Sequence, residues 1–262
     1  MATQWQTYPI EFRGGLISNQ SRLQQGTNAV GSATFLQNFE VNKEGGYTKI
    51  KGYEKFSDTT VPGSGPVLGL KVVDSGKVLA ARKNASNLTE WYYGSGTTWT
   101  SMGAGTFLGN KARHVTFKLG TNVQVAIVDG VNFPAVYDTG DDSLTYMTAS
   151  DSSDVEGADH VAFFKSTAFY AKNNILYFTA PLTVDDFSVA NGAGTINVSH
   201  DVTGLVVFRD QLIVFTENTV QRITGTTAAD FTMSPITDRI GCISADTIQE
   251  VGGDIMYVAP DG

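Results

Sequence analysis

Histidines are the side chains of this sequence that most often bind metals or move protons. His114, His160 and His200 stand far apart, and none belongs to a HxxxH or HExxH pattern or has a cysteine partner. Metal sites in proteins use such ligands at short, defined spacings. The sequence therefore predicts no histidine-based metal centre, and we expect the three histidines at strand starts or in loops between strands.

Cys242 is the only cysteine in the 262 residues. A single cysteine cannot form an internal disulfide or supply a cluster of thiolates for zinc. Because Cys242 stands beside a predicted strand, we interpret it as a small buried core residue.

Seven acidic residues fall within one segment, at Asp138, Asp141, Asp142, Asp151, Asp154, Glu156 and Asp159. Calcium prefers clustered carboxylates, but this spacing matches neither the EF-hand loop nor a glycine-rich calcium repeat. The segment is therefore interpreted as a solvated loop, with cation binding as the alternative. A calorimetric titration with calcium that shows no heat would remove that alternative.

Other catalytic signatures are missing from the sequence, since no GxSxG elbow, P-loop or strand-following GxGxxG occurs. A glycosidase needs only two carboxylates, and such a claim would rest on Asp74, Asp185 and Asp186. Asp186 belongs to a repeated sequence, which favours a structural role. We therefore expect no enzyme activity, no catalytic residue, no bound metal and no cofactor.

The elements that would position these residues are copies of one short unit. Apolar, strand-like segments recur at intervals of 45, 45, 44 and 43 residues, around Val78, Val123, Ala168, Leu212 and Ile255. A pair of turn-forming residues follows each segment, and a further apolar strand follows four of them. Two of the copies also share similar later sequences, Asp186-Phe187-Ser188 and Asp230-Phe231-Thr232.

A period in the low forties with about four strands in each unit is typical of a β-propeller. The predicted fold is therefore all-β, a propeller-like array of four-stranded antiparallel blades, and a β-sandwich of evenly spaced strands is the alternative. The run from Leu212 to Phe215 has no polar alternation, so we expect neighbouring sheets on both of its faces. Ile213→Asp should then cost several kcal/mol, and Asp142→Asn in a solvated loop about half a kcal/mol at most.

The sequence divides into an N-terminal arm, a linker and the repeats. Residues 1–56 lack the repeat, and a hairpin with its turn at 44–46 and a short helix within 27–39 are expected there. Residues 57–66 are rich in turn formers and are interpreted as a linker. The repeats occupy 67–262, and the last blade is incomplete, so we expect that the natural chain continues or that another segment completes this blade.

Composition excludes several classes of protein. Hydrophobic residues at 41%, 28 glycines and 17% charged residues fit a turn-rich β protein and exclude a disordered or coiled-coil chain. No apolar run approaches the ~18 residues of a membrane span, and the N-terminus lacks the pattern of a secretory signal. The net charge of −8 argues against a general nucleic-acid binder.

Two groups of residues resemble a known family. They are Gly14, Gly15, Asn38, Gly45, Gly46 and Gly52 in the arm, and Asp186, Phe187, Gly204 and Gly241 in the repeats. In these positions the chain resembles the tail nozzle and tail-hub proteins of short-tailed bacteriophages, including the tail tubular B-like and packaged-DNA stabilisation groups. The relatives usually carry Arg-Pro-Gly where this chain has Lys49-Ile50-Lys51-Gly52, and many of them are longer.

The resemblance implies a structural protein of the virion tail, without a catalytic residue. It implies assembly with itself into a six-fold ring around the DNA exit channel, beside tail proteins such as an adaptor or fibres. Genomic DNA would pass through without sequence-specific binding, because an acidic lumen repels phosphates. The alternatives are a propeller-type interaction module for a receptor, glycan or fibre, and, less favoured, a carbohydrate-active enzyme.

Overall fold

The computed structural model describes residues 15–17, 32–33, 35–41, 46–73 and 76–261. The chain forms two compact units, Met1–Lys55 and Phe56–Gly262. In the first unit, β1 (Phe39–Val41) pairs antiparallel with β2 (Tyr47–Lys49). Gly14, Gly45 and much of the segment expected to form a short helix lie outside the described residues, and Phe39 at the end of that segment begins a strand.

The described part of the second unit contains four sheets of four strands and one sheet of two, all antiparallel. Blade 1 consists of β3 (Ser64–Val72), β4 (Val78–Lys83), β5 (Thr89–Gly94) and β6 (Trp99–Ala104). Blade 2 consists of β7 (Arg113–Lys118), β8 (Val123–Val128), β9 (Ala135–Asp138) and β10 (Ser143–Tyr146). Blade 3 consists of β11 (His160–Phe164), β12 (Thr167–Lys172), β13 (Ile175–Phe178) and β14 (Gly194–Asn197). Blade 4 consists of β15 (Val202–Phe208), β16 (Gln211–Thr216), β17 (Val220–Thr224) and β18 (Thr232–Thr237), and the terminal sheet consists of β19 (Gln249–Val251) and β20 (Asp254–Met256).

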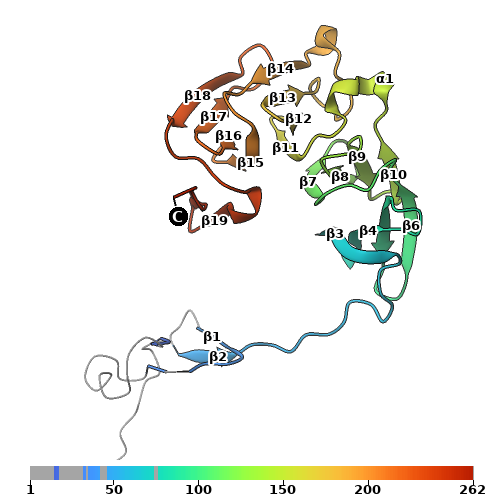
Figure 1. The fold of residues 1–262 in the computed structure, drawn as a ribbon, viewed down its shortest axis with the longest axis vertical. Helices are drawn as coiled ribbons and strands as arrows, with labels where there is room; N and C mark the ends of the chain where they lie inside the picture. The colour runs from blue at the N-terminus through green and yellow to red at the C-terminus, as the bar shows by residue number, and fades with distance from the viewer. Residues whose placement is uncertain (1–14, 18–31, 34, 42–45, 74–75, 262) are drawn as a thin grey trace, which may run out of the picture. The chain divides into compact units, whose positions relative to one another are not determined.

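The sheets form a propeller-like array. Strands follow one another across each blade in sequence order, and the first strand β11 contacts the first strands β7 and β15 of the neighbouring blades. Figure 1 shows the sheets of the second unit in an arc, with these first strands towards its centre. The predicted fold class is confirmed, since the sheets succeed one another around a centre and do not face each other as the two layers of a sandwich.

The sequence repeat corresponds to the second strand of each sheet. This strand contains Val78 in blade 1, Val123 in blade 2, Ala168 in blade 3, Leu212 in blade 4 and Ile255 in the terminal sheet. The first four belong to four-stranded blades, whereas Ile255 belongs to the two-stranded sheet.

Both faces of a central strand are covered by neighbouring sheets. In β16, Leu212 and Val214 pack in a hydrophobic cluster with residues of blade 3 such as Phe169. Ile213 and Phe215 point the other way and pack in a cluster that includes residues of the terminal sheet. Alternate side chains of a strand leave on opposite faces, so an unbroken apolar run is what a doubly covered strand requires.

The segment expected to be a linker, 57–66, is partly built into blade 1. β3 begins at Ser64 and takes in its last three residues. Arg82 Nη1 donates a hydrogen bond to the carbonyl oxygen of Val61 at 2.6 Å, and Trp99 Nε1 donates to that of Thr59 at 3.1 Å. The turn-forming residues of the segment lead into β3: Gly63, just before the strand, has φ +107°, a conformation that glycine adopts readily.

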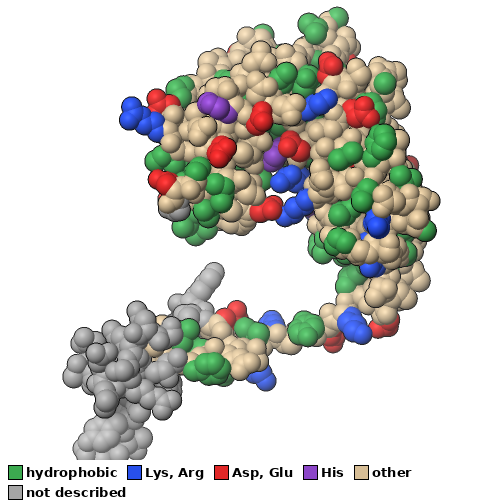
Figure 2. All heavy atoms as spheres, viewed as in Figure 1, with side chains coloured by type: hydrophobic (Ala, Val, Ile, Leu, Met, Phe, Trp, Pro, Cys, Tyr) green, Lys and Arg blue, Asp and Glu red, His purple; other side chains and the backbone are tan. Residues whose placement is uncertain are grey.

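Charges of both signs are spread over the visible face of the second unit (Figure 2). No helix in the described part of the chain has the length and apolarity that crossing a membrane requires.

Candidate functional site: an acidic groove beside blade 2

The acidic segment 138–159 is part of the folded array. It holds the end of β9, all of β10, the helix α1 (Ala149–Ser152) and the 3-10 helix η2 (Ser153–Val155). Val155 and Ala158 are fully buried in the cluster between blades 2 and 3. The prediction of a solvated loop holds for the exposed side chains of Asp141, Asp151 and Asp154, but the segment also forms β10, α1 and η2 and packs against the next blade through Val155 and Ala158.

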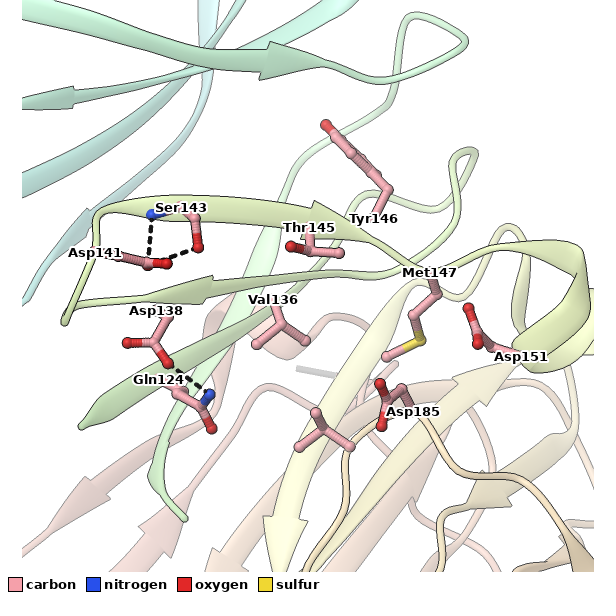
Figure 3. A pocket seen from close by; sticks show the side chains of 11 residues that line it. Gln124, Val136, Asp138, Asp141, Ser143, Thr145, Tyr146, Met147, Asp151 and Asp185 are labelled. Carbon is pink, nitrogen blue, oxygen red and sulfur yellow. Dashed lines mark hydrogen bonds between the residues drawn. The ribbon is translucent and has the colours of Figure 1, made fainter. Parts of the chain in front are cut away.

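An open groove of about 310 Å³ runs along the β9–β10 hairpin. Its carboxylates are those of Asp138, Asp141, Asp151 and Asp185. Figure 3 shows Asp138 and Asp141 near the turn of the hairpin, and Asp151 and Asp185 at the other end, near Met147. The fold thus brings Asp185 to the acidic segment, from which it is separated in the sequence.

Two of the groove carboxylates hold the hairpin turn. Asp138 accepts hydrogen bonds from Gln124 Nε2 at 2.9 Å and from the backbone nitrogen of Gly140 at 2.7 Å. Asp141 accepts from the hydroxyl and backbone nitrogen of Ser143 at 2.7 and 3.1 Å, and these bonds lower the pKa of the Asp141 carboxyl. The general acid of a glycosidase needs a raised pKa, so Asp141 is unsuited to that role.

A third groove carboxylate, that of Asp151, caps α1. It accepts hydrogen bonds from the backbone nitrogen and hydroxyl of Thr148 at 2.7 and 2.9 Å, and so completes a capping box. Among the described residues, no group of three or more His, Cys, Asp or Glu side chains is placed to hold a metal ion. Asp138 and Asp141 therefore stabilise the hairpin turn, Asp151 stabilises the start of α1, and together with Asp185 they give the groove a negative charge. Asp74 lies outside the described residues.

Asp142 connects blade 2 to blade 1. Its carboxylate accepts hydrogen bonds from Lys77 Nζ at 2.5 Å and from the hydroxyl of Tyr137 at 2.6 Å. Tyr137 is fully buried between the two blades, and the Asp142 side chain is only 23% exposed. The expectation of a freely solvated Asp142 was wrong, because its partner Lys77 comes from a different repeat, which no local sequence pattern shows.

Asp142→Asn is therefore expected to lower the free energy of unfolding by about 1–2 kcal/mol at pH 7, measured by urea denaturation. The hydrogen bonds from Lys77 and Tyr137 lower the pKa of the Asp142 carboxyl in the folded state. The stabilisation is thus fully present above the unfolded pKa of about 4 and is lost as the pH falls through the folded pKa. If the wild-type protein were still more stable than Asp142→Asn by the same amount at pH 2.5, this assignment would be contradicted. The control is Asp238→Asn: Asp238 is exposed, so its replacement should change the free energy of unfolding little at either pH.

The three histidines have different surroundings. His160 begins β11 and is buried, with Nδ1 2.9 Å from Asp159 Oδ1. His114 lies in β7, where burial and then the charge of Lys71 lower its pKa to about 4. His200 is exposed just before β15. These positions agree with strand starts and loops, and they do not assemble a metal triad within the described residues.

Cys242 is fully buried in the cluster between blade 4 and the terminal sheet. Its thiol donates a hydrogen bond to the carbonyl oxygen of Ser244 at 3.2 Å. Gly241, just before it, packs so tightly that an added Cβ would lie 2.1 Å from the carbonyl oxygen of Thr216. Gly204 is similarly enclosed, since a Cβ there would lie 2.5 Å from Ile248 Cδ1.

The Asp-Phe pairs of the repeat build turns and cores. Asp186 accepts a hydrogen bond from the backbone nitrogen of Ser188 at 2.8 Å, and Phe187 packs 5.8 Å from Tyr170, ring centre to ring centre.

Asp230 and Phe231 also hold a turn and fill a core in blade 4, but Asp230 accepts from backbone nitrogens that precede it in the chain, whereas Asp186 accepts from one that follows it. Asp230 accepts from the backbone nitrogen of Thr227 at 2.6 Å, and Phe231 packs 5.4 Å from Phe169 and 5.6 Å from Phe178. The shared sequence therefore has a shared structural role in neighbouring blades.

In the first unit, the described residues in which the chain resembles the tail family are distinguished by their backbone conformation and hydrogen bonding. Asn38 and Gly46 have φ of 61° and 89°, and Gly15 has φ of 73°. The carbonyl oxygen of Asn38 accepts a hydrogen bond from the nitrogen of Ile50 at 3.0 Å, which extends the hairpin beyond its strands. Gly52 has no atom within 4 Å of the place where a Cβ would stand.

No family profile and no curated protein matches this chain. Among solved structures, the extracellular domain of BT4673 from B. thetaiotaomicron is similar, with 7% identity and a TM-score of 0.41. The AfRom2 CNH domain is similar with 10% identity and a TM-score of 0.40. The similarity to the BT4673 domain covers 76% of this chain and 32% of that domain. The similarity to the CNH domain covers 84% of this chain and 68% of that domain. Likenesses at this level carry no inference about function.

Proposed function

We propose that this chain is a structural protein without enzyme activity, a propeller-like component of the tail of a short-tailed bacteriophage. In the virion it would assemble with itself into a ring, six-fold in symmetry, around the channel through which DNA leaves. Neighbouring tail proteins, such as an adaptor or fibres, would contact the same ring.

The observation that carries the proposal is the structural role of the residues in which the chain resembles that family. Asp186 holds a turn, Phe187 fills a core, and Gly204 and Gly241 allow close packing. These residues form turns of the blades and the packing contacts between them. Blades of this kind offer rigid surfaces, and heterologous contacts between such surfaces close into rings.

The test is the oligomeric state of the purified chain. We expect negative-stain images and native mass spectrometry to show closed rings, with six-fold symmetry. A chain that stays monomeric up to high micromolar concentration would refute the ring.

The second candidate function is an interaction module, and the acidic groove favours it. The carboxylates of Asp138, Asp141, Asp151 and Asp185 would face a partner surface rich in lysine or arginine. This function predicts a soluble monomer that binds such a partner, with an association rate that falls as salt is added. If the chain forms rings and does not bind a lysine- or arginine-rich partner, the result would favour the tail component over the interaction module.

A further inference from the structure

The interfaces between neighbouring sheets of the second unit are built alike. In the second strand of a sheet, alternate side chains pack against the preceding sheet, and the side chains between them pack against the following sheet. In blade 4 these are Leu212 and Val214 on one side, and Ile213 and Phe215 on the other. We call the side towards the preceding sheet the leading face, and the side towards the following sheet the trailing face.

The leading face of blade 1 is partly open. The β3–β4 ladder sets Leu70 and Val72 beside the side chains of β4 that point to this side. At the other edge, segment 56–61 covers the face, since the ring of Trp99 lies 6.0 Å from that of Phe56, centre to centre. Leu70 is 58% exposed and Val72 64%, so the edge formed by β3 is an uncovered apolar surface.

The trailing face of the terminal sheet is open as well. Ile255 and Tyr257 pack on blade 4, so Met256 between them points to the opposite side. The β19–β20 ladder places Val251 opposite Asp254, on the same side as Met256. Met256 is 60% exposed and Val251 52%. Exposed apolar surfaces of this kind mark sites of contact with other proteins.

The surroundings of the two faces have opposite charge. Residues 64–104, which form blade 1, contain four Lys and Arg and two Asp and Glu, and they stay net positive although Lys77 pairs with blade 2. Residues 238–261, which include the terminal sheet, contain one Arg and five Asp and Glu. Arg209 and Lys111 pair with two of these acids and leave the region net negative. The two faces therefore attract each other, whereas two copies of the same face repel.

We propose that the leading face of blade 1 binds the trailing face of the terminal sheet in a second copy of this chain. Leu70 and Val72 of one copy cover Val251 and Met256 of the next, so the packing between sheets continues from copy to copy. The inference rests on the self-assembly proposed above and names the surfaces that meet. Because the two surfaces differ, the contact is heterologous, the type from which rings are built.

The first experiment asks whether the two faces meet. Leu70→Cys and Met256→Cys, made separately, mixed and treated with a short bis-maleimide, are expected to form a cross-linked dimer. Neither variant alone should form it, and the wild-type chain should not react, because Cys242 is fully buried. The double variant, with both cysteines in one chain, should give a ladder of cross-linked oligomers.

The second experiment measures the strength of self-association by sedimentation velocity. Leu70→Ser and Met256→Ser change exposed side chains, so the fold should be kept, and each should raise the dissociation constant at least about tenfold. The matched control is Val189→Ser in η3 (Val189–Asn191), which is 79% exposed and lies on neither face, so association should not change. Added salt should weaken association of the wild-type chain.

The outcomes separate this contact from the ring itself. A chain that does not self-associate would overturn both. Self-association that withstands the two serine variants, without a cross-link between the two cysteine variants, would leave the ring standing and overturn this contact. A double variant that is cross-linked only within one chain would show that the two faces close on each other, and would overturn binding to a second copy.

Discussion

Ile213→Asp is expected to lower the free energy of unfolding by about 3–5 kcal/mol, as measured by urea denaturation followed by tryptophan fluorescence. Ile213 is 4% exposed and packs with Phe215, Val220 and Cys242 between blade 4 and the terminal sheet. Its replacement removes a buried branched side chain and places a carboxyl group among apolar atoms. The carboxyl must stay protonated or remain without a partner, and each choice costs free energy.

The matched control is Val207→Asp in the same blade. Val207 pairs with Leu212 across the β15–β16 ladder, but its side chain is 41% exposed, so an aspartate there can be hydrated. We expect this variant to lose less than about 1 kcal/mol. Equal losses of unfolding free energy in the two variants would mean that the face of β16 that carries Ile213 and Phe215 is not covered by the terminal sheet.

Gly241→Ala is expected to cost about 3 kcal/mol, although it adds a single methyl group. The new Cβ would lie 2.1 Å from the carbonyl oxygen of Thr216 and 2.4 Å from the carbonyl carbon of Glu217. Both are backbone atoms of the turn between β16 and β17, which the hydrogen bond from the nitrogen of Cys242 to Thr216 also ties down at 2.8 Å. The clash therefore cannot be relieved by a rotamer change, and the turn or the segment at Gly241 has to move.

Gly52→Ala is the matched control, because both glycines are positions of resemblance to the tail family. No atom lies within 4 Å of a Cβ at Gly52, and its φ is not in the left-handed region. We expect Gly52→Ala to change the free energy of unfolding by about half a kcal/mol at most, as a surface substitution does. A Gly241→Ala protein as stable as Gly52→Ala would show that the close approach to Thr216 does not exist in solution.

Local patterns in the sequence predicted the blades well. The strands around Val78, Val123, Ala168 and Leu212 are visible as apolar runs with turn formers behind them, because strand pairing within a blade joins neighbours in the sequence. Phe187 and Phe231 recur for the same reason, since each packs in the cluster between its own blade and the preceding one. The linker was less well predicted, because turn formers serve equally for a free segment and for the entry of β3 at Ser64.

The sequence by itself determined the fold class, the repeat and the second strand of each sheet, since these depend on the order of apolar residues and turn formers along the chain. Only the tertiary structure decided which charged residues meet. Lys77 reaches Asp142 and Lys111 reaches Asp246 from different sheets, and Asp185 joins an acidic groove from another blade. The physical reason is that contacts between sheets depend on the placement of whole blades around a centre. No local sequence pattern predicts which residue of another blade a charged side chain will contact.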